Sequence, residues 1–126
     1  MSLVQLLSIM LGGALGAITR YLLSNLVYDW LGRDFPYGTL TVNVIGSFLM
    51  GLLTIFFLQK GNIDPAMRLG LLVGFVGALT TFSTFSLDTL VLIQEGVLFR
   101  AMLNVLLSVV VCVIAVWFGM ITARQF

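Results

Sequence analysis

Residues 101–123 read AMLNVLLSVVVCVIAVWFGMITA, a run of 23 residues without a charged side chain. A helix needs roughly 20 mostly apolar residues to cross the hydrocarbon core of a bilayer. Three further charge-free runs have a similar length, namely 1–19, 35–59 and 69–87. This pattern predicts four membrane-spanning helices, at about 4–28, 38–59, 66–95 and 98–123.

The composition of the whole chain indicates the same class. Of its 126 residues, 60% are hydrophobic and only 9% are charged, whereas a soluble domain carries about 25% charged residues. We therefore expect an all-α integral membrane protein of the multi-pass kind. Residues 1–126 should form a single four-helix transmembrane domain, with the lipid bilayer as its surroundings.

Several kinds of chemistry are excluded by what the chain lacks. It has no histidine, so acid–base catalysis and metal binding by imidazole are absent. Its one cysteine, Cys112, forms neither an internal disulfide nor a thiolate cage for a metal. The net charge of +1 provides no basic surface for nucleic acid. We expect neither an enzyme nor a nucleic-acid-binding protein.

Glycines give the first and third spans a special character. Gly12 and Gly16 have the spacing that lets a second helix pack closely. In the third span, residues 74–86 read GFVGALTTFSTFS, and Gly, Ser and Thr are poor helix formers that compete for backbone hydrogen bonds. We predict a break in this helix near 77–81. Because irregular backbone at membrane depth is tolerated only beside a cavity or within protein, the break should belong to a functional site.

Uncharged polar residues recur at helical spacing in the other spans. One set lies in the second span and another in the fourth, and the members of each set share a helix face: Thr39, Asn43 and Ser47, and Asn104, Ser108 and Cys112. Amides and hydroxyls donate hydrogen bonds without a fixed charge, which suits a small anion that must bind and then leave. Phe82 and Phe85 could turn positive ring edges toward the same ion. Two ordinary core phenylalanines are the alternative.

The cations give almost no preference for one orientation in the membrane. One end of the bundle is expected to hold Lys60, Arg68 and Arg124, and the other end Arg33 and Arg100. The tally is 3 to 2, or 3 to 3 with Arg20. An excess of Lys and Arg on the cytoplasmic side fixes the orientation of a membrane protein. A count that is nearly equal at the two ends therefore favours insertion in both orientations. A single fixed topology is the alternative, and a homodimer would cover the polar faces.

Two strings of sequence resemble the Fluc (CrcB) family of fluoride channels. They are GTLTVN at 38–43 and TTFSTFS at 80–86, and they occur together with a glycine-rich first span that contains Arg20. The resemblance covers essentially the whole chain. It implies a passive, fluoride-selective channel in the bacterial inner (plasma) membrane that exports cytoplasmic fluoride. It also implies an antiparallel, dual-topology homodimer with two pores.

The resemblance further implies roles for particular residues. Fluoride would be contacted by Asn43, Phe82 and Phe85. Ser83 and Thr84 lie between the two rings, with Ser83 the preferred pore hydroxyl. The fourth span would add a polar track of Asn104 and Ser108, from which Cys112 departs because it has a thiol where a hydroxyl is expected.

Two further roles are implied for charged groups and ions. Arg20 would lie beside a vestibule and raise the local anion concentration, although an arginine that reaches for the membrane interface is an equal alternative. A structural sodium ion would bind at the dimer centre, held by the backbone carbonyls of Gly77 and Thr80.

Two other functions fit the length and the number of spans. A small dual-topology multidrug exporter needs a carboxylate within the membrane, but the first span offers Arg20, and the deepest acid is Asp88, two turns from the end of the third span. A membrane scaffold without transport would use the polar faces only for helix pairing, which is worth about 0.6–2 kcal/mol per contact.

Overall fold

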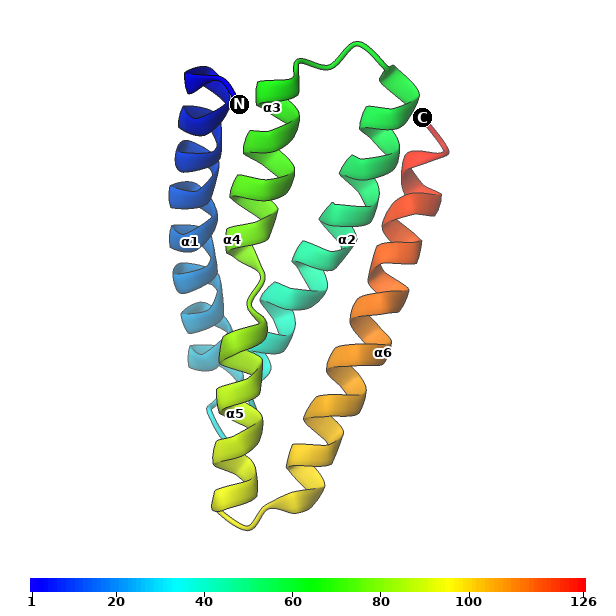
Figure 1. The fold of residues 1–126 in the computed structure, drawn as a ribbon. Helices are drawn as coiled ribbons and strands as arrows, with labels where there is room; N and C mark the ends of the chain where they lie inside the picture. The colour runs from blue at the N-terminus through cyan, green and yellow to red at the C-terminus, as the bar shows by residue number, and fades with distance from the viewer.

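The computed structural model describes all 126 residues and consists entirely of helices and short connections (Figure 1). The elements follow in the order α1 (Leu3–Leu31), α2 (Tyr37–Lys60), α3 (Pro65–Leu69), η1 (Gly70–Val76), α4 (Gly77–Leu79), α5 (Phe82–Gln94) and α6 (Leu98–Ala123). The four pieces from α3 to α5 make one interrupted span, Pro65–Gln94. All four spans are long and apolar enough to cross a membrane. The expected class, four helices with a broken third, is confirmed.

The third span is irregular in two places. The segment η1 is a π-helix, which the sequence did not predict, and its wide turns present Gly70 and Gly74 to α1. The break itself falls at Thr80 and Thr81, whose backbones are extended, with ψ values of 155° and 115°. The predicted interval of 77–81 therefore contains the break, although residues 77–79 still form a helical turn.

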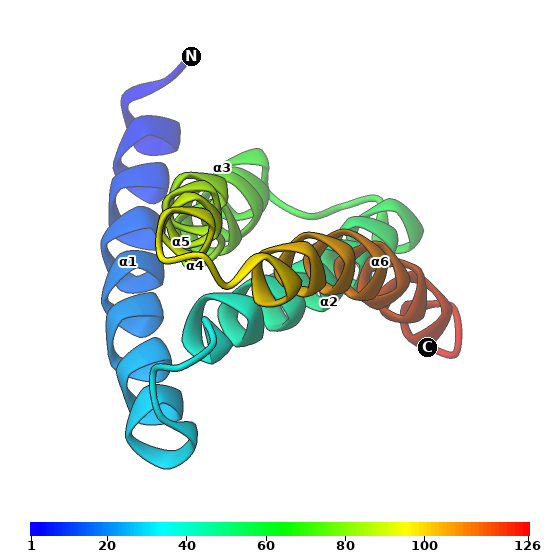
Figure 2. The ribbon, with the colours of Figure 1, turned by 90° about the horizontal axis from the view of Figure 1, so that it is seen from below.

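Helix pairs in the bundle meet backbone to backbone. A Cβ atom on Gly12 would collide with the Gly70 carbonyl oxygen, and one on Gly16 with the Phe75 carbonyl oxygen. The packing role predicted for these two glycines is confirmed. Gly51 meets the Val116 carbonyl in the same way, which joins α2 to α6. Figure 2 shows the result from below, with α1 against the third span and α6 along α2.

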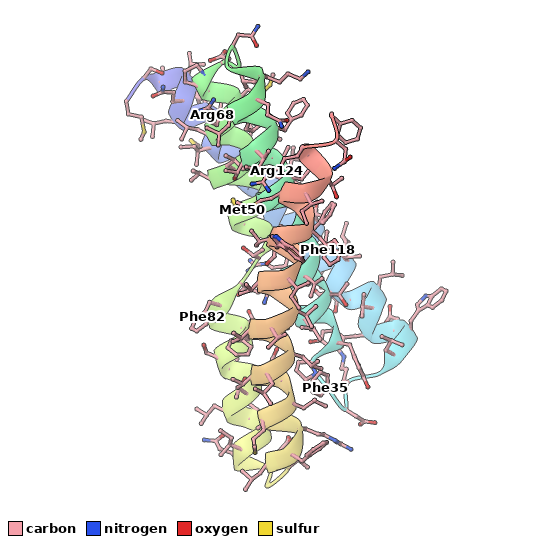
Figure 3. The ribbon with its side chains drawn as sticks, turned by 90° about the vertical axis from the view of Figure 1, so that its right-hand side faces the viewer. Phe35, Met50, Arg68, Phe82, Phe118 and Arg124 are labelled. Carbon is pink, nitrogen blue, oxygen red and sulfur yellow. The ribbon has the colours of Figure 1, made fainter.

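Large apolar side chains cover the outside of the bundle. On α1 and α6 many are more than half exposed, among them Leu11, Val113 and Phe118. Such a surface suits contact with lipid or with another membrane helix. Figure 3 shows Phe118 and Phe82 on this outer surface, with Arg68 and Arg124 at one end of the bundle, where the topology predicted them.

Candidate functional site at the helix break

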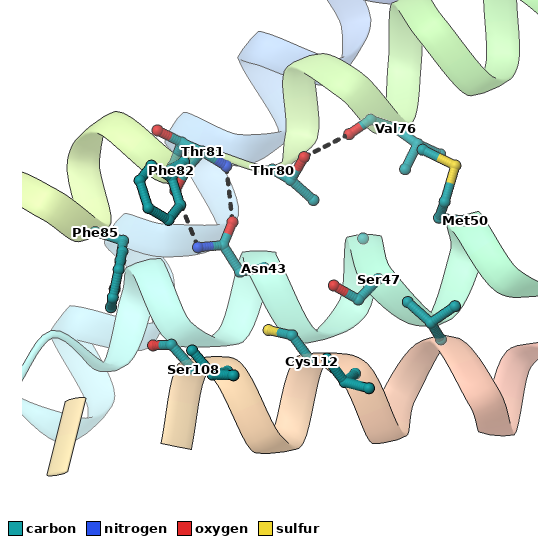
Figure 4. Close-up of a pocket in the computed structure, with 14 residues that line it drawn as sticks. Asn43, Ser47, Met50, Val76, Thr80, Thr81, Phe82, Phe85, Ser108 and Cys112 are labelled. Atoms are coloured by element: carbon teal, nitrogen blue, oxygen red, sulfur yellow. Dashed lines mark hydrogen bonds between the residues drawn. The ribbon is translucent and has the colours of Figure 1, made fainter. Parts of the chain in front are cut away.

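The break in the third span is held open by one side chain from α2. The Asn43 amide nitrogen donates to the Thr81 carbonyl at 3.0 Å, and the Thr81 N–H donates to the Asn43 amide oxygen at 2.7 Å (Figure 4). Asn43 thus replaces both hydrogen bonds that Thr81 would make in a continuous helix. An amide nitrogen carries two protons, so one N–H of Asn43 remains for a ligand.

Thr81 also begins the helix that follows. Its hydroxyl oxygen accepts from the Thr84 N–H at 3.1 Å, which makes Thr81 the N-cap of α5. The amides of Phe82 and Ser83 lie in the first turn, where no intrahelical acceptor exists. Backbone N–H groups at a helix start carry partial positive charge, so this end of α5 favours an anion.

The break frees the two carbonyls that sodium was predicted to use. In a continuous helix the Gly77 carbonyl would accept from Thr81 N–H, and the Thr80 carbonyl from Thr84 N–H. The first of these donors binds Asn43, and the second binds the Thr81 hydroxyl. Gly77 also has open space where a side chain would be, since a Cβ there would meet only the Leu72 carbonyl, at 3.6 Å. Both carbonyls fit the donor set that a hard monovalent cation needs.

A cavity of about 420 Å³ lies beside the break, between α2, α6 and the third span. Its lining changes along its length (Figure 4). One end is polar and aromatic, with Asn43, Thr81, Phe85 and Ser108, and the other end is lined by apolar side chains: Met50, Val76 and Val116. The cavity therefore offers uncharged donors at one end and apolar walls at the other.

Phe82 and Phe85 come together at the polar end, as predicted. Their ring centroids are 5.3 Å apart and the ring planes are tilted by 51°. Both line the cavity, but Phe85 is 9% exposed and Phe82 is 78% exposed. A core role could describe Phe85 but not Phe82, whose ring stands at the open edge of the cavity.

The fourth-span residues divide between two tasks. Ser108 and Cys112 line the cavity. Asn104 does not: it is 2% exposed, donates to the Thr89 hydroxyl at 2.9 Å and accepts from the Ser108 hydroxyl at 3.4 Å. In this chain Asn104 joins α6 to α5 and orients Ser108 instead of reaching the cavity itself.

The two hydroxyl residues between the rings also separate. Ser83 is exposed and lines neither cavity at the break. Thr84 lines a second cavity, of about 170 Å³, on the α1 side. Within one chain, Thr84 therefore lies beside enclosed space and Ser83 lies on the exposed surface, and the preference for Ser83 as the pore hydroxyl stays a prediction.

Arg20 faces this second cavity. The other polar side chains around it are uncharged: Tyr21, Ser24, Thr39, Thr81 and Thr84. Arg20 is the one charged residue that lines this space, and the Asp88 carboxylate lies behind Thr39, which donates to it at 2.8 Å. Thr81 lines both this cavity and the larger one. The break is therefore the wall between an Arg20-lined chamber and the aromatic cavity, which supports the vestibule reading of Arg20.

Two polar residues contribute more than the sequence assigned to them. The Thr39 hydroxyl donates to the Asp88 carboxylate at 2.8 Å and lies 3.2 Å from the Tyr28 hydroxyl, which ties α1, α2 and α5 together. Ser47 lines the larger cavity opposite Cys112. Both share the face of α2 that carries Asn43, and that spacing was the one available signal.

Comparison with known proteins identifies close relatives. The family model described as CrcB-like protein, Camphor Resistance (CrcB), matches residues 7–120. A protein of Methylococcus capsulatus named fluoride-specific ion channel FluC is 57% identical over 97% of this chain, which spans 54% of that protein's length. Proteins of the same name from Magnetococcus marinus and Geobacter metallireducens are 53% and 51% identical, over 96% and 98% of this chain and 98% and 99% of their own lengths.

Proposed function

Because this chain belongs to the CrcB-like family, we propose that it is a fluoride-specific ion channel. It is a multi-pass protein of the bacterial plasma membrane, and it lets fluoride leave the cytoplasm passively. The observation that carries the proposal is the position of Thr81. This residue separates an Arg20-lined chamber from an aromatic cavity, and every polar group that lines the aromatic cavity is uncharged.

The donors at the break suit a small, strongly hydrated anion. Fluoride gives up its water only where other donors replace it. The free N–H of Asn43, the first-turn amides of α5 and the ring edges of Phe82 and Phe85 supply such donors without a counter-charge that would trap the ion. Neither cavity at the break is lined by Asp or Glu. The acids Asp34, Asp88 and Glu95 line a separate cavity together with Arg33 and Arg100, so a proton-coupled exporter would have no carboxylate at the break.

We further propose that two copies assemble antiparallel. A single chain encloses the larger cavity on one side and leaves the other side open. Three residues at the open edge are each more than half exposed: Phe82, Val109 and Val113. A second copy would close this edge. The almost even count of cations at the two ends permits both orientations, so an antiparallel homodimer with two pores satisfies both observations.

The freed carbonyls of Gly77 and Thr80 are proposed to hold a structural sodium ion between the two copies. Two broken helices would contribute four carbonyl oxygens, the ligand type that hard cations prefer. When bound, the ion would balance the partial negative charge of these carbonyls. The sodium ion would have a structural role, and fluoride movement would depend on Asn43, the first-turn amides of α5 and the two phenylalanine rings.

Fluoride efflux from liposomes tests the function directly. Purified protein is reconstituted with a fluoride or chloride gradient, and release is followed with ion-selective electrodes. We expect rapid fluoride release without a proton gradient and chloride release close to that of empty liposomes. Chloride release as fast as fluoride release would contradict the proposal.

Labelling tests the antiparallel arrangement separately. Cys112 is first replaced by Ser, and Asn62, in the exposed loop between α2 and α3, is replaced by Cys. A membrane-impermeant thiol reagent added outside intact cells should then label about half of the molecules, since half would present this loop outward. Complete labelling or none would show a single orientation.

A further inference from the structure

The hydroxyl of Ser47 occupies the middle of the larger cavity, where its lining changes from polar to apolar. Ser47 lies one turn of α2 beyond Asn43, and Met50 follows it toward the apolar end (Figure 4). Under the proposed function, fluoride that moves along the cavity would leave Asn43 and next reach the position of Ser47, where a donor has to replace its water.

Four hydroxyl residues line the cavity, and three of them already donate within the chain. Thr80 donates to the Val76 carbonyl at 3.2 Å, Thr81 to the Thr84 hydroxyl at 3.0 Å, and Ser108 to the Asn104 amide oxygen at 3.4 Å. Ser47 donates to no oxygen or nitrogen of the chain, and its one hydrogen-bonding neighbour is the Cys112 thiol. Ser47 is half-buried and lines the cavity, so its hydroxyl is accessible from that space.

Several hydroxyls elsewhere in the spans are bound by the backbone of their own helix. Thr41, Thr89 and Thr122 each donate to the carbonyl four residues earlier, at 2.7–2.8 Å, as Ser and Thr commonly do in helices. The one polar side chain set against Ser47 is the Cys112 thiol on α6. A thiol is a weak donor and a weak acceptor, so an anion displaces it from Ser47 at little cost.

The facing helix offers no strong donor at this level. Along the cavity, α6 presents Ser108, then Cys112, then Val116, so donor strength falls to nothing over two turns. The hydroxyl that lies against Cys112 comes from α2, and it belongs to Ser47.

We propose that Ser47 is a fluoride-contacting residue of this chain. Its hydroxyl donates to the ion one turn beyond Asn43 and supplies from α2 the donor that α6 lacks at Cys112. This inference rests on the proposed channel function and deepens it. A hydrogen bond to an ion is stronger than one between neutral groups, so loss of this donor should raise the barrier to fluoride passage.

The test is a rescue across the two helices. Fluoride efflux from liposomes is measured for the wild-type protein, Ser47→Ala, Cys112→Ser, and the double variant. We expect Ser47→Ala to slow fluoride release about tenfold, and the double variant to recover to within about threefold of Cys112→Ser. Recovery of the efflux rate in the double variant would show that a hydroxyl on α6, opposite position 47, replaces the lost one. A role of Ser47 in the packing of α2 would not be restored in this way.

The controls separate this inference from the proposed function and from misfolding. Thr41→Val removes a hydroxyl from the same helix outside the cavity and should leave the efflux rate unchanged. If Ser47→Ala does not assemble normally on size exclusion, Ser47→Cys keeps the side-chain size with a weaker donor and should also slow release. An active wild type with unchanged efflux in Ser47→Ala, or no recovery in the double variant, overturns the role of Ser47. An inactive wild type overturns the channel function itself.

Discussion

The two halves of the third span use different residues for different tasks. From Pro65 to Leu79 the span packs closely on α1, where glycines of both helices let the two backbones approach each other. From Phe82 to Gln94 the span carries aromatic and hydroxyl groups and is fixed mainly through side-chain hydrogen bonds, such as that from Asn104 to Thr89. Glycine therefore allows close helix packing in the first half, and polar side chains provide hydrogen-bond donors in the second half.

The largest effect is expected where the first half meets α1. Gly12→Val would drive a side chain into the Gly70 carbonyl, and backbone cannot move aside as a side chain can. We expect almost no folded protein, measured as the monodisperse fraction after extraction in detergent. The matched control is Gly13→Ala on the same helix, where the nearest atom to a new Cβ is 4.0 Å away. A normal yield of the valine variant would show that the contact between α1 and the third span can adjust to a side chain at position 12.

The next largest effect is expected at the junction of the two halves. Asn43→Asp keeps an acceptor for the Thr81 N–H but loses the donation to the Thr81 carbonyl, and it adds a negative charge beside the proposed anion path. We expect fluoride efflux to fall about a hundredfold, which is the effect of roughly 2.7 kcal/mol on the barrier. Efflux near the wild-type rate would remove Asn43 from the site.

Within the second half, the rings should matter less than the junction. Replacement of Phe82 or Phe85 by Ile keeps apolar bulk but loses the ring edge, an interaction of about 0.5–1.5 kcal/mol. We expect efflux to fall by up to about tenfold in each variant. Phe118→Ile, on the outer face of α6, is the control and should match wild type. Equal rates in all three variants would mean that the rings serve only packing.

The smallest effect separates the two hydroxyls between the rings. Thr84 lines the chamber beside Arg20, whereas Ser83 is exposed outside both cavities. Thr84→Val should slow fluoride efflux a few-fold, in line with one lost hydrogen bond of about 1 kcal/mol, and Ser83→Ala should not change it. If instead Ser83→Ala slowed efflux and Thr84→Val did not, Ser83 would line the fluoride path in the dimer.

Local patterns in the sequence were enough to predict the spans, the break and the helix-packing glycines. Charge-free runs, weak helix formers and glycine spacing all act over a few residues, so no knowledge of neighbours was needed. The prediction was weaker for faces beyond the irregular segments. The extended backbone at Thr80 and Thr81 interrupts the helical spacing, so spacing alone does not show that Thr84 lines the cavity beside Arg20 while Ser83 is exposed.

Partners from other spans decided the remaining roles. Asn104 shares a face with Ser108 and Cys112, yet Thr89 binds it and takes it out of the cavity. The sequence marks Ser47 only as one hydroxyl among several, because nothing in it shows that the other cavity hydroxyls donate elsewhere. Which polar group is free depends on which acceptors the folded chain brings near it.

The double hydrogen bond between Asn43 and Thr81 has a consequence for selectivity. Because one side chain from α2 grips both polar groups of a residue in another span, neither helix can shift along or around its axis without losing both bonds. The opening in the third span is therefore preorganised before any ion arrives. Donors held at fixed positions before the ion arrives would favour the smallest halide over larger ones, because they need no rearrangement to surround it.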